Sequence, residues 1–277
     1  MLNLNTISDS LELRADGIWY AKITKSVSYP DEGNKDCMQL EDTSYWFKHR
    51  NNCILSLVKT GGKNDVFYDI GGGNGFVSET LEQAGIETVL IEPGIYGAKN
   101  AKSRGLNNVI CATTETCGIR RDTLDAIGLF DVVEHIEDDH GFLKQNYEML
   151  KNGGYIYITL PALKLLWSNE DIYAGHFRRY TMKLAKQLLR KTGFGVGVVF
   201  YSYLFSALPL PIFLMRSLPS RLGFHKNMDD IDQCKKEHSS DKSERLLQKV
   251  WDWELGRISR RKTVPFGSSI IIVGRKL

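Results

Sequence analysis

Three glycines, Gly71, Gly73 and Gly75, directly follow an apolar run and precede the amphipathic stretch VSETLEQAG. A backbone this bare at the end of a strand lets a ligand lie against the main chain, where the next helix presents its free N–H groups. Asp69 stands two residues before Gly71, where a carboxylate would repel a pyrophosphate but attract a cationic cofactor. Glu92 follows Gly71 by about 20 residues, the spacing at which an acidic residue accepts hydrogen bonds from ribose hydroxyls. The pattern predicts a positively charged nucleoside cofactor.

Other glycine-rich loops fit this stretch less well. The dinucleotide fingerprint requires Gly or Ala three residues after its second glycine, and the bulky Phe76 occupies that position. The phosphate-loop motif, which ends in Gly-Lys-Ser/Thr, is absent from the sequence. A nicotinamide-dependent oxidoreductase and a nucleoside triphosphatase are therefore disfavoured, whereas a tight turn without any ligand stays open as an alternative.

Two histidines are candidate general bases, because imidazole titrates near neutral pH. His135 lies in DVVEHIEDD and His176 in AGHFRRYT, and each follows a run predicted to be a strand. Ligands of doubly wound sheets bind beyond the carboxyl ends of the strands, so both imidazoles are expected near the site. Loop hydrogen bonding for His135, and helix capping or packing for His176, are the structural alternatives. Asp131, Glu134 and His135 also form D-x-x-E-H, which specifies a divalent cation only weakly, and we expect no metal.

The residues around His176 are candidates for contact with an acceptor. Arg178 and Arg179 follow it directly, and a guanidinium can form paired hydrogen bonds with a phosphate or a carboxylate. Because adjacent residues point in different directions, we expect at most one of the two arginines in the site; surface ion pairs are the alternative. Tyr180 and Trp167 are candidates for an aromatic wall of the site, with core packing as the alternative.

The elements that must position these residues alternate between strands and helices. Amphipathic runs indicate helices at 43–62, 77–85, 97–105, 141–154, 181–194 and 243–258. Apolar runs rich in β-branched and aromatic residues indicate strands at 66–70, 88–93, 108–113, 124–130, 155–161, 197–203 and 268–273. This order predicts an α/β fold, a doubly wound parallel sheet with helices on both faces.

Composition limits the class of protein. The 277 residues, 42% hydrophobic and 25% charged, suit one large domain or one domain with additions, and the net charge of +3 does not indicate a nucleic-acid partner. The first ten residues lack the basic and apolar regions of a signal peptide, and the five cysteines are scattered, so we expect reduced thiols and a cytoplasmic protein. Residues 192–215 carry no charge, but their glycines and prolines favour a strand and an apolar helix or loop over a membrane span.

Four motifs, DIGGGNG, LIEPG, LFDVVEHIEDD and LKNGGYIYITLP, resemble in order those of class I S-adenosylmethionine-dependent methyltransferases. The resemblance implies S-adenosylmethionine as the cofactor and a seven-stranded Rossmann-like sheet whose last strand is antiparallel. It implies that the methionine end of the cofactor contacts Asp69, Gly71, Gly73, Gly75, Phe130 and Asp131. It also implies Glu92 on the ribose and Ala112 and Thr113 near the adenine, although family members usually carry an acidic residue at the position of Ala112. Related enzymes use an N-terminal helix as a lid, which implies that Arg50 binds the cofactor carboxylate.

A narrower resemblance covers nearly the whole chain. LEDTSYWFKHRN, LWSNEDIYAGHFRRYT and VPFGSSIIIVGRK are similar to a bacterial subgroup associated with polysaccharide and lipid-linked glycan pathways. We therefore expect methyl transfer, at oxygen, to a small-molecule, glycan or lipid-linked acceptor. A non-catalytic S-adenosylmethionine-binding protein and, less favoured, an NAD(P)-dependent oxidoreductase are the alternatives.

The chain is expected to divide into four parts. They are an N-terminal extension with the lid helix (1–60), the cofactor-binding core (61–203), a helical insertion that caps the acceptor site (204–265), and the final core strand (266–277). The insertion separates strands six and seven and begins with the apolar stretch 204–222. Two interpretations of this stretch are open: peripheral contact with a membrane, or packing against the amphipathic helix 243–258.

Overall fold

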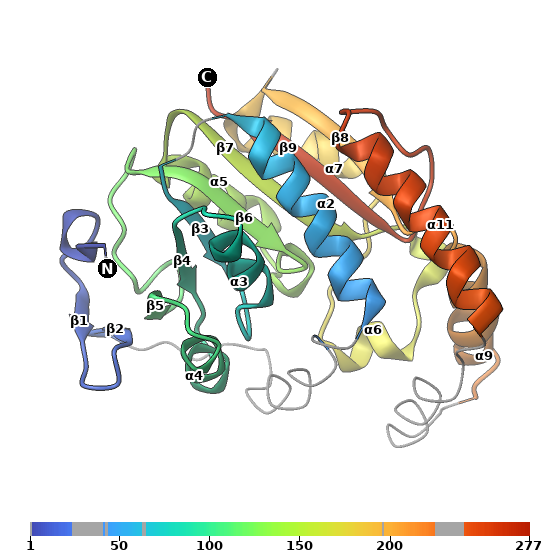
Figure 1. Ribbon diagram of the computed structural model, residues 1–277, viewed down its shortest axis with the longest axis horizontal. Helices are drawn as coiled ribbons and strands as arrows, with labels where there is room; N and C mark the ends of the chain where they lie inside the picture. The colour runs from blue at the N-terminus through green and yellow to red at the C-terminus, as the bar shows by residue number, and fades with distance from the viewer. Residues whose placement is uncertain (1, 24–40, 42–43, 63–64, 196, 225–240) are drawn as a thin grey trace.

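The computed structural model describes residues 2–23, 41, 44–62, 65–195, 197–224 and 241–277, with side chains from 247 onward in the last range. Within these residues one nine-stranded sheet crosses the molecule, in the order β1-β2-β5-β4-β3-β6-β7-β9-β8 (Figure 1). The seven strands that the sequence predicted are β3 (Phe67–Ile70), β4 (Thr88–Ile91), β5 (Asn108–Cys111), β6 (Leu124–Phe130), β7 (Leu150–Pro161), β8 (Val198–Leu204) and β9 (Ser269–Arg275). β3 to β7 pair in parallel, and β9 lies antiparallel between β7 and β8. The predicted fold class is confirmed.

A hairpin widens the sheet beyond the seven predicted strands. It consists of β1 (Leu11–Leu13) and β2 (Trp19–Ala21), and β2 pairs in parallel with β5. All three residues of β2 are buried, so the hairpin covers an edge of the sheet that would otherwise present unpaired backbone groups.

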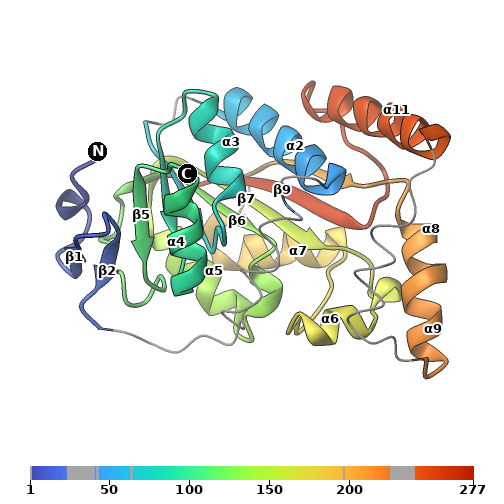
Figure 2. The ribbon, with the colours of Figure 1, turned by 60° about the horizontal axis from the view of Figure 1, so that its bottom comes forward.

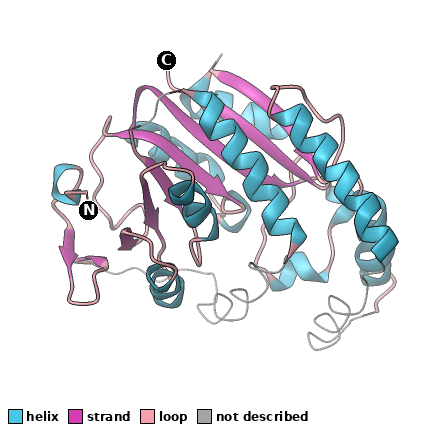
Figure 3. Ribbon diagram, in the orientation of Figure 1, coloured by secondary structure: helices cyan, strands magenta, loops and turns pink. Residues whose placement is uncertain are grey.

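Helices cover both faces of the sheet; Figure 3 shows the helices in cyan and the strands in magenta. The helical elements are η1 (Leu4–Thr6), α2 (Tyr45–Gly61), α3 (Phe76–Gln83), α4 (Ile95–Ser103), η2 (Val133–His135), α5 (Asp139–Met149), η3 (Lys164–Leu166), α6 (Asn169–Tyr173), α7 (Met182–Leu189), η4 (Arg190–Phe194), α8 (Pro209–Ile212), η5 (Phe213–Ser217), α9 (Leu218–Arg221) and α11 (Asp241–Ile258). α2, α3 and α11 share one apolar core with one face of the sheet, whereas α5 and α7 share another core with the opposite face (Figure 2).

One predicted boundary is wrong. The helix expected over 141–154 ends at Met149, and β7 begins at Leu150 instead of residue 155. The pair Gly153-Gly154 therefore interrupts a strand and does not cap a helix; Gly153 adopts φ +83°. The pairing of β6 with β7 changes register at this point, as glycine in a strand often indicates.

The described residues of the insertion between β8 and β9 form helices, as predicted. α11 packs beside α2, whereas η5 packs on η3 and α6 at the end of β7. The apolar stretch therefore has partners on two sides: Phe205 and Leu208 share a core with Trp251 of the amphipathic helix 243–258, whereas η5 packs on the side of the molecule that carries α6. No helix of the described residues combines the length and the apolar character needed to cross a bilayer. The division of the chain into four parts stays a prediction.

Candidate active site

The glycine loop between β3 and α3 has the backbone that its sequence requires. Gly71, Gly73 and Gly75 adopt φ angles of +70°, +54° and +79°, in the left-handed region that disfavours side chains. A Cβ at Gly71 would lie 2.8 Å from the Val132 side chain, and one at Gly75 would lie 2.6 Å from that of Leu106. Gly75 begins α3 without a side-chain cap, so the first N–H groups of the helix are available to a ligand.

Asp69 lies beneath this loop and is fully buried. Its Oδ2 accepts a hydrogen bond from the Ser78 hydroxyl at 2.7 Å, while its Oδ1 has no partner in the described residues. Burial raises the pKa of Asp69 to about 6, against the lowering effects of Ser78 and Arg50. A buried carboxylate with an unsatisfied oxygen is a group that a neighbouring cation would stabilise.

Glu92, at the end of β4, is turned towards the glycine loop. Its carboxylate accepts hydrogen bonds from the backbone N–H groups of Gly73 at 2.9 Å and Gly94 at 2.7 Å. A carboxylate has about four acceptor positions, so ribose hydroxyls can still bind to it. Ala112 is buried, and its N–H donates to the Glu92 carbonyl, while the Thr113 hydroxyl is engaged with Thr116. The predicted adenine side therefore has no acidic side chain at position 112, where family members usually carry one.

Asp131 and Arg50 meet at the end of β6. Asp131 adopts φ +57°, an unusual conformation for a residue other than glycine, and its Oδ2 accepts a hydrogen bond from Arg50 Nη1 at 2.5 Å. The Arg50 guanidinium also lies over the rings of Trp46 and Phe47, and its Nε has no partner in the described residues. The Phe130 ring packs in the core, so only its backbone can face a cofactor. α2 therefore brings Arg50 to the predicted site, although much of α2 is a core helix.

His135 and His176 face one another with ring centroids 4.7 Å apart. His176 Nδ1 lies 2.9 Å from Asp171 Oδ1, and Arg179 Nε donates to the same oxygen at 2.8 Å. Burial would raise the pKa of Asp171, but His176 and Arg179 outweigh it and lower the pKa. An ionised Asp171 fixes the Nδ1–H tautomer of His176 and leaves Nε2 free as an acceptor. Burial, and then the electrostatic repulsion that a protonated His176 would exert, lower the pKa of His135 to about 4, so its imidazole is neutral at pH 7.

Glu134 completes a small cluster with the two histidines. One ligand atom from each of Glu134, His135 and His176 lies within 4.8 Å of the others. Glu134 is buried, its Oε2 has no partner in the part of the chain described, and burial together with Asp131 raises its pKa well above the ordinary value. The donor set of one carboxylate and two imidazoles suits a divalent transition metal, so the prediction of no metal needs an experiment.

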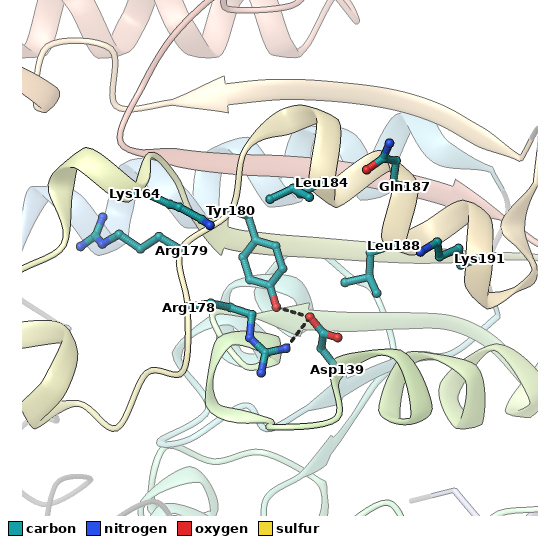
Figure 4. Close-up of a pocket in the computed structure, with 9 residues that line it drawn as sticks. All are labelled: Asp139, Lys164, Arg178, Arg179, Tyr180, Leu184, Gln187, Leu188 and Lys191. Atoms are coloured by element: carbon teal, nitrogen blue, oxygen red, sulfur yellow. Dashed lines mark hydrogen bonds and ion pairs between the residues drawn. The ribbon is translucent and has the colours of Figure 1, made fainter.

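Three of the four predicted acceptor residues, Arg178, Arg179 and Tyr180, line a pocket of about 240 Å³ (Figure 4). Arg178 pairs with Asp139 at 2.7 Å, and the Tyr180 hydroxyl donates to the same carboxylate oxygen at 2.9 Å. Arg179 pairs with Asp171 at 2.8 Å. The ion pairs that were the alternative for the two arginines are therefore present, although both arginines and Tyr180 also line the pocket. Trp167 follows η3 and is half-buried, outside the pocket lining.

Sequence reasoning missed three groups that matter to this region. Asp171 orients His176, and its spacing of five residues from the histidine carried no recognised signal. Lys164 and Lys191 line the pocket from η3 and η4, 27 positions apart, so only the tertiary structure brings them to one cavity. Lys164 follows the predicted strand 155–161 by three residues and could have been noted as a candidate, whereas Lys191 lies within the predicted helix 181–194 and carried no such signal.

The residues present fit S-adenosylmethionine, whose sulfonium and ammonium groups are cationic. Asp69 precedes the glycine loop, and Asp131 adjoins Val132, whose side chain a Cβ at Gly71 would meet. In the described residues the carboxyls of Asp69 and of Glu134, which follows Val132 by two positions, each retain a buried oxygen without a partner. Such atoms cost free energy unless a polar or charged ligand reaches them. Glu92 lies on the other side of the loop, at the position that suits a ribose.

Residues 52–196, just over half of the chain, match the family model of a methyltransferase domain. The chain is similar to the ubiquinone biosynthesis O-methyltransferase of Parvibaculum lavamentivorans, with 33% identity over 98 residues, which cover 34% of this chain and 39% of that protein. It is similar to the mitochondrial ubiquinone biosynthesis O-methyltransferase of Rattus norvegicus, with 31% identity over 121 residues, which cover 38% of this chain and 35% of that protein. The chain thus spans less than half the length of these curated relatives.

Two solved structures share the fold. An S-adenosylmethionine-dependent methyltransferase of Thermotoga maritima superposes with a TM-score of 0.51 at 17% identity, over 87% of this chain and 98% of that chain. Phosphoethanolamine N-methyltransferase 2 of Haemonchus contortus, solved with S-adenosyl-L-methionine, superposes with a TM-score of 0.54 at 15% identity, over 93% of this chain and 61% of that chain. At these identities the likeness is one of fold.

Proposed function

The chain belongs to the class I S-adenosylmethionine-dependent methyltransferases, and we propose that it methylates a hydroxyl oxygen of a small-molecule, glycan or lipid-linked acceptor. When bound, the cofactor supplies a methyl group that its sulfonium already activates. The main task of the protein is then to align that methyl group with the acceptor oxygen, and to remove the hydroxyl proton.

The observation that carries this proposal is the pairing of Asp171 with His176 beside His135. A hydroxyl is a weak nucleophile until a base takes its proton, and a useful base is one held in a single tautomer by a third group. Asp171 holds His176 in this way, at 2.9 Å, with Nε2 free to accept the proton. His176 is therefore the proposed base, and the neutral His135 lies next to it as a positioning group.

The same proposal assigns the cofactor-side residues. Gly71, Gly73 and Gly75 allow the methionine end to approach the backbone, Glu92 accepts the ribose hydroxyls, and Arg50 binds the carboxylate through its free donors. Asp69 and Asp131 favour the cationic groups, while Ala112, Thr113 and Phe130 contribute shape and backbone groups only. Trp167, Arg178, Arg179 and Tyr180 stay as proposed acceptor-side residues.

Oxygen as the methylated atom has support from the curated relatives. Both are named O-methyltransferases of ubiquinone biosynthesis, and their similarity covers about a third of this chain. Nucleic acid is a poor acceptor on physical grounds, because the net charge of the chain is only +3 with both signs interspersed.

The test is transfer of labelled methyl groups from S-adenosylmethionine into separated lipid, glycan, small-molecule, protein and nucleic-acid fractions of a bacterial extract. We expect label in one of the first three fractions, lost with His176→Ala and retained with His140→Ala, an exposed histidine on α5. Label in protein or nucleic acid would contradict the proposed acceptor class. Tight cofactor binding without label in any fraction would favour a non-catalytic binding protein.

A chelator arm of the same assay addresses the metal. We expect transfer to persist after treatment with EDTA. Loss of transfer that added Mg²⁺ or Zn²⁺ restores would overturn that expectation and assign the ion to Glu134, His135 and His176, whose ligand atoms are close enough to share one cation.

A further inference from the structure

The pocket beside the histidine pair is strongly cationic. Lys164, Arg178, Arg179 and Lys191 line it, and Asp139 is the only acidic residue among its lining residues. Its formal lining charge is therefore +3. Its volume of about 240 Å³ exceeds what a phosphate group alone requires. A cavity with this excess of positive charge favours an anionic ligand.

The two lysines are the groups in this pocket that the fold itself does not use. Arg178 pairs with Asp139 and donates to the Glu137 carbonyl, and Arg179 pairs with Asp171. In the described part of the chain, neither Lys164 nor Lys191 forms an ion pair. Two unpaired ammonium groups on opposite sides of one cavity are well suited to the oxygens of a phosphate.

An apolar stripe is connected to the pocket through η3. Leu210, Leu214, Leu218 and Leu222 recur every fourth residue along the continuous helical stretch 209–221 and its end, so they share one side, which we call the leucine stripe. Their side chains are 66%, 51%, 37% and 64% exposed. The stretch packs through η5 on η3, the short helix that also carries Lys164 into the pocket. A cationic cavity and an exposed apolar surface are thus joined by one three-residue element, η3.

We propose that this pocket binds the phosphate of an amphiphilic acceptor, and that the hydrocarbon chain of the acceptor lies along the leucine stripe. The neighbouring positive charge indicates the occupant of the stripe, because an alkyl phosphate satisfies both surfaces at once. Arg179 lines the pocket, and its guanidinium is turned away from the other lining residues and binds Asp171, the carboxylate that orients His176, so one residue links the pocket to the proposed base. This inference rests on the proposed function and names the acceptor class within it.

The test is equilibrium binding to the full-length chain by isothermal titration calorimetry, with decyl phosphate, decanol and inorganic phosphate as separate probes. We expect decyl phosphate to bind at least about tenfold more tightly than either of the others, since only it contacts both surfaces. Equal affinity for decyl phosphate and inorganic phosphate would reduce the site to an anion pocket and overturn the amphiphile. Absence of decyl phosphate binding would overturn the whole inference.

Matched variants separate the two surfaces. Lys164→Ala combined with Lys191→Ala should weaken decyl phosphate at least about tenfold and leave decanol unchanged, because it removes two charge-assisted contacts. Lys183→Ala is the control, since this exposed lysine lies on α7 outside the pocket lining. Leu210→Gln combined with Leu214→Gln should lower the affinity for decyl phosphate to that for inorganic phosphate. Leu13→Gln is the control, because this exposed leucine lies at the far edge of the sheet and its loss should leave the decyl phosphate affinity unchanged. A lysine effect that Lys183→Ala reproduces would contradict the site.

Vesicles of phosphatidylglycerol form a last arm. Binding to vesicles that depends on Lys164 and Lys191, together with no binding of monomeric decyl phosphate, would mean that a membrane surface is the occupant, against the proposal. Failure of the inference differs from failure of the proposed function. Methyl transfer to a neutral acceptor, without decyl phosphate binding, would support the proposed function and overturn the phosphate site. Decyl phosphate binding without methyl transfer to any acceptor would support the phosphate site and contradict the proposed function.

Discussion

Glu254 is a buried carboxylate that joins three separate parts of the chain. It lies on α11 with 0% exposure and accepts hydrogen bonds from His49 Nε2 on α2 at 3.0 Å and from the Phe205 N–H at 2.9 Å. The N–H and the hydroxyl of Ser206 donate to its other oxygen, each at 2.5 Å. α2, the end of β8 and α11 therefore share one side chain.

Glu254→Ala should lower the free energy of unfolding by about 3–5 kcal/mol. The substitution leaves the Phe205 and Ser206 N–H groups and the Ser206 hydroxyl without their acceptor in a buried place. For a chain of this size each kcal/mol moves the melting temperature by about 2 °C, so we expect a fall of roughly 6–10 °C. Asp252→Ala, at an exposed position two residues earlier on the same helix, should change it by less than about 1 °C.

The pH dependence of stability gives a second readout for the same carboxylate. Burial would raise the pKa of Glu254, but the hydrogen bonds from His49, Ser206 and Phe205 outweigh it and lower the pKa. A lowered pKa stabilises the fold fully above the unfolded value of about 4.3, and this stabilisation is lost as the pH falls through the folded value. The gap between wild type and Glu254→Gln should therefore be largest near neutral pH and shrink below about pH 4.

Urea-induced unfolding followed by tryptophan fluorescence measures both quantities. A loss of less than about 1 kcal/mol for Glu254→Ala, or a gap to Glu254→Gln that stays constant from pH 7 to pH 3, would refute the reasoning. Either result would mean that the carboxylate is solvated or protonated in solution, and that the three segments are held together by apolar packing alone.

Three further predictions concern the site. Arg50→Ala should raise the Kd for S-adenosylmethionine, measured by calorimetry, more than about tenfold because a charged donor is lost. Lys48→Ala, on the exposed side of α2, should leave the Kd unchanged. An unchanged Kd for Arg50→Ala would exclude Arg50 from the cofactor site. Asp171→Asn should slow methyl transfer by about 100-fold or more with little change in the cofactor Kd, because His176 loses its fixed tautomer. If cofactor affinity fell as much as the transfer rate, the variant would have a folding defect and the result would contradict this role. Gly75→Ala should lower the free energy of unfolding by about 2–3 kcal/mol in denaturant titrations, and a neutral effect would contradict the φ of +79°.

Much of the fold follows from local sequence patterns. The alternation of apolar and amphipathic runs predicts seven of the strands and their parallel order, because each signal lies within a few residues. The antiparallel direction of the last strand was implied only by the resemblance to class I methyltransferases. The edge hairpin joins the sheet through pairing with β5, about ninety residues away, and no local pattern specifies that pairing. The premature end of α5 has the same cause, since Gly153-Gly154 suits a helix end and a strand irregularity equally well.

The site residues also fall into those that a local sequence pattern predicts and those that only the tertiary structure brings together. The glycine loop and Glu92 could be predicted because their spacing is fixed within one strand–turn–helix unit. The contacts of Arg50 with Asp131, and of His49 with Glu254, join residues 81 and 205 positions apart. Such pairs follow from the packing of α2 on the sheet and beside α11, which depends on all the elements together. A motif can therefore name the candidate groups, but only the assembled fold decides which of them touch.

Asp69 shows how the fold and the proposed function make opposite demands on one residue. Burial raises the pKa of Asp69 to about 6, so ionising this carboxyl at neutral pH lowers the free energy of unfolding. The fold is therefore most stable with respect to this group below the unfolded pKa, and it loses that stability as the pH rises through the folded pKa. An aliphatic residue would avoid this cost, yet the chain keeps a carboxyl with one unsatisfied oxygen beneath the glycine loop. A cationic cofactor next to that oxygen would stabilise the ionised form and offset the cost. The free energy lost in the unliganded fold thus becomes available for binding, which is why an apparent defect of packing is the expected property of a site for a sulfonium cofactor.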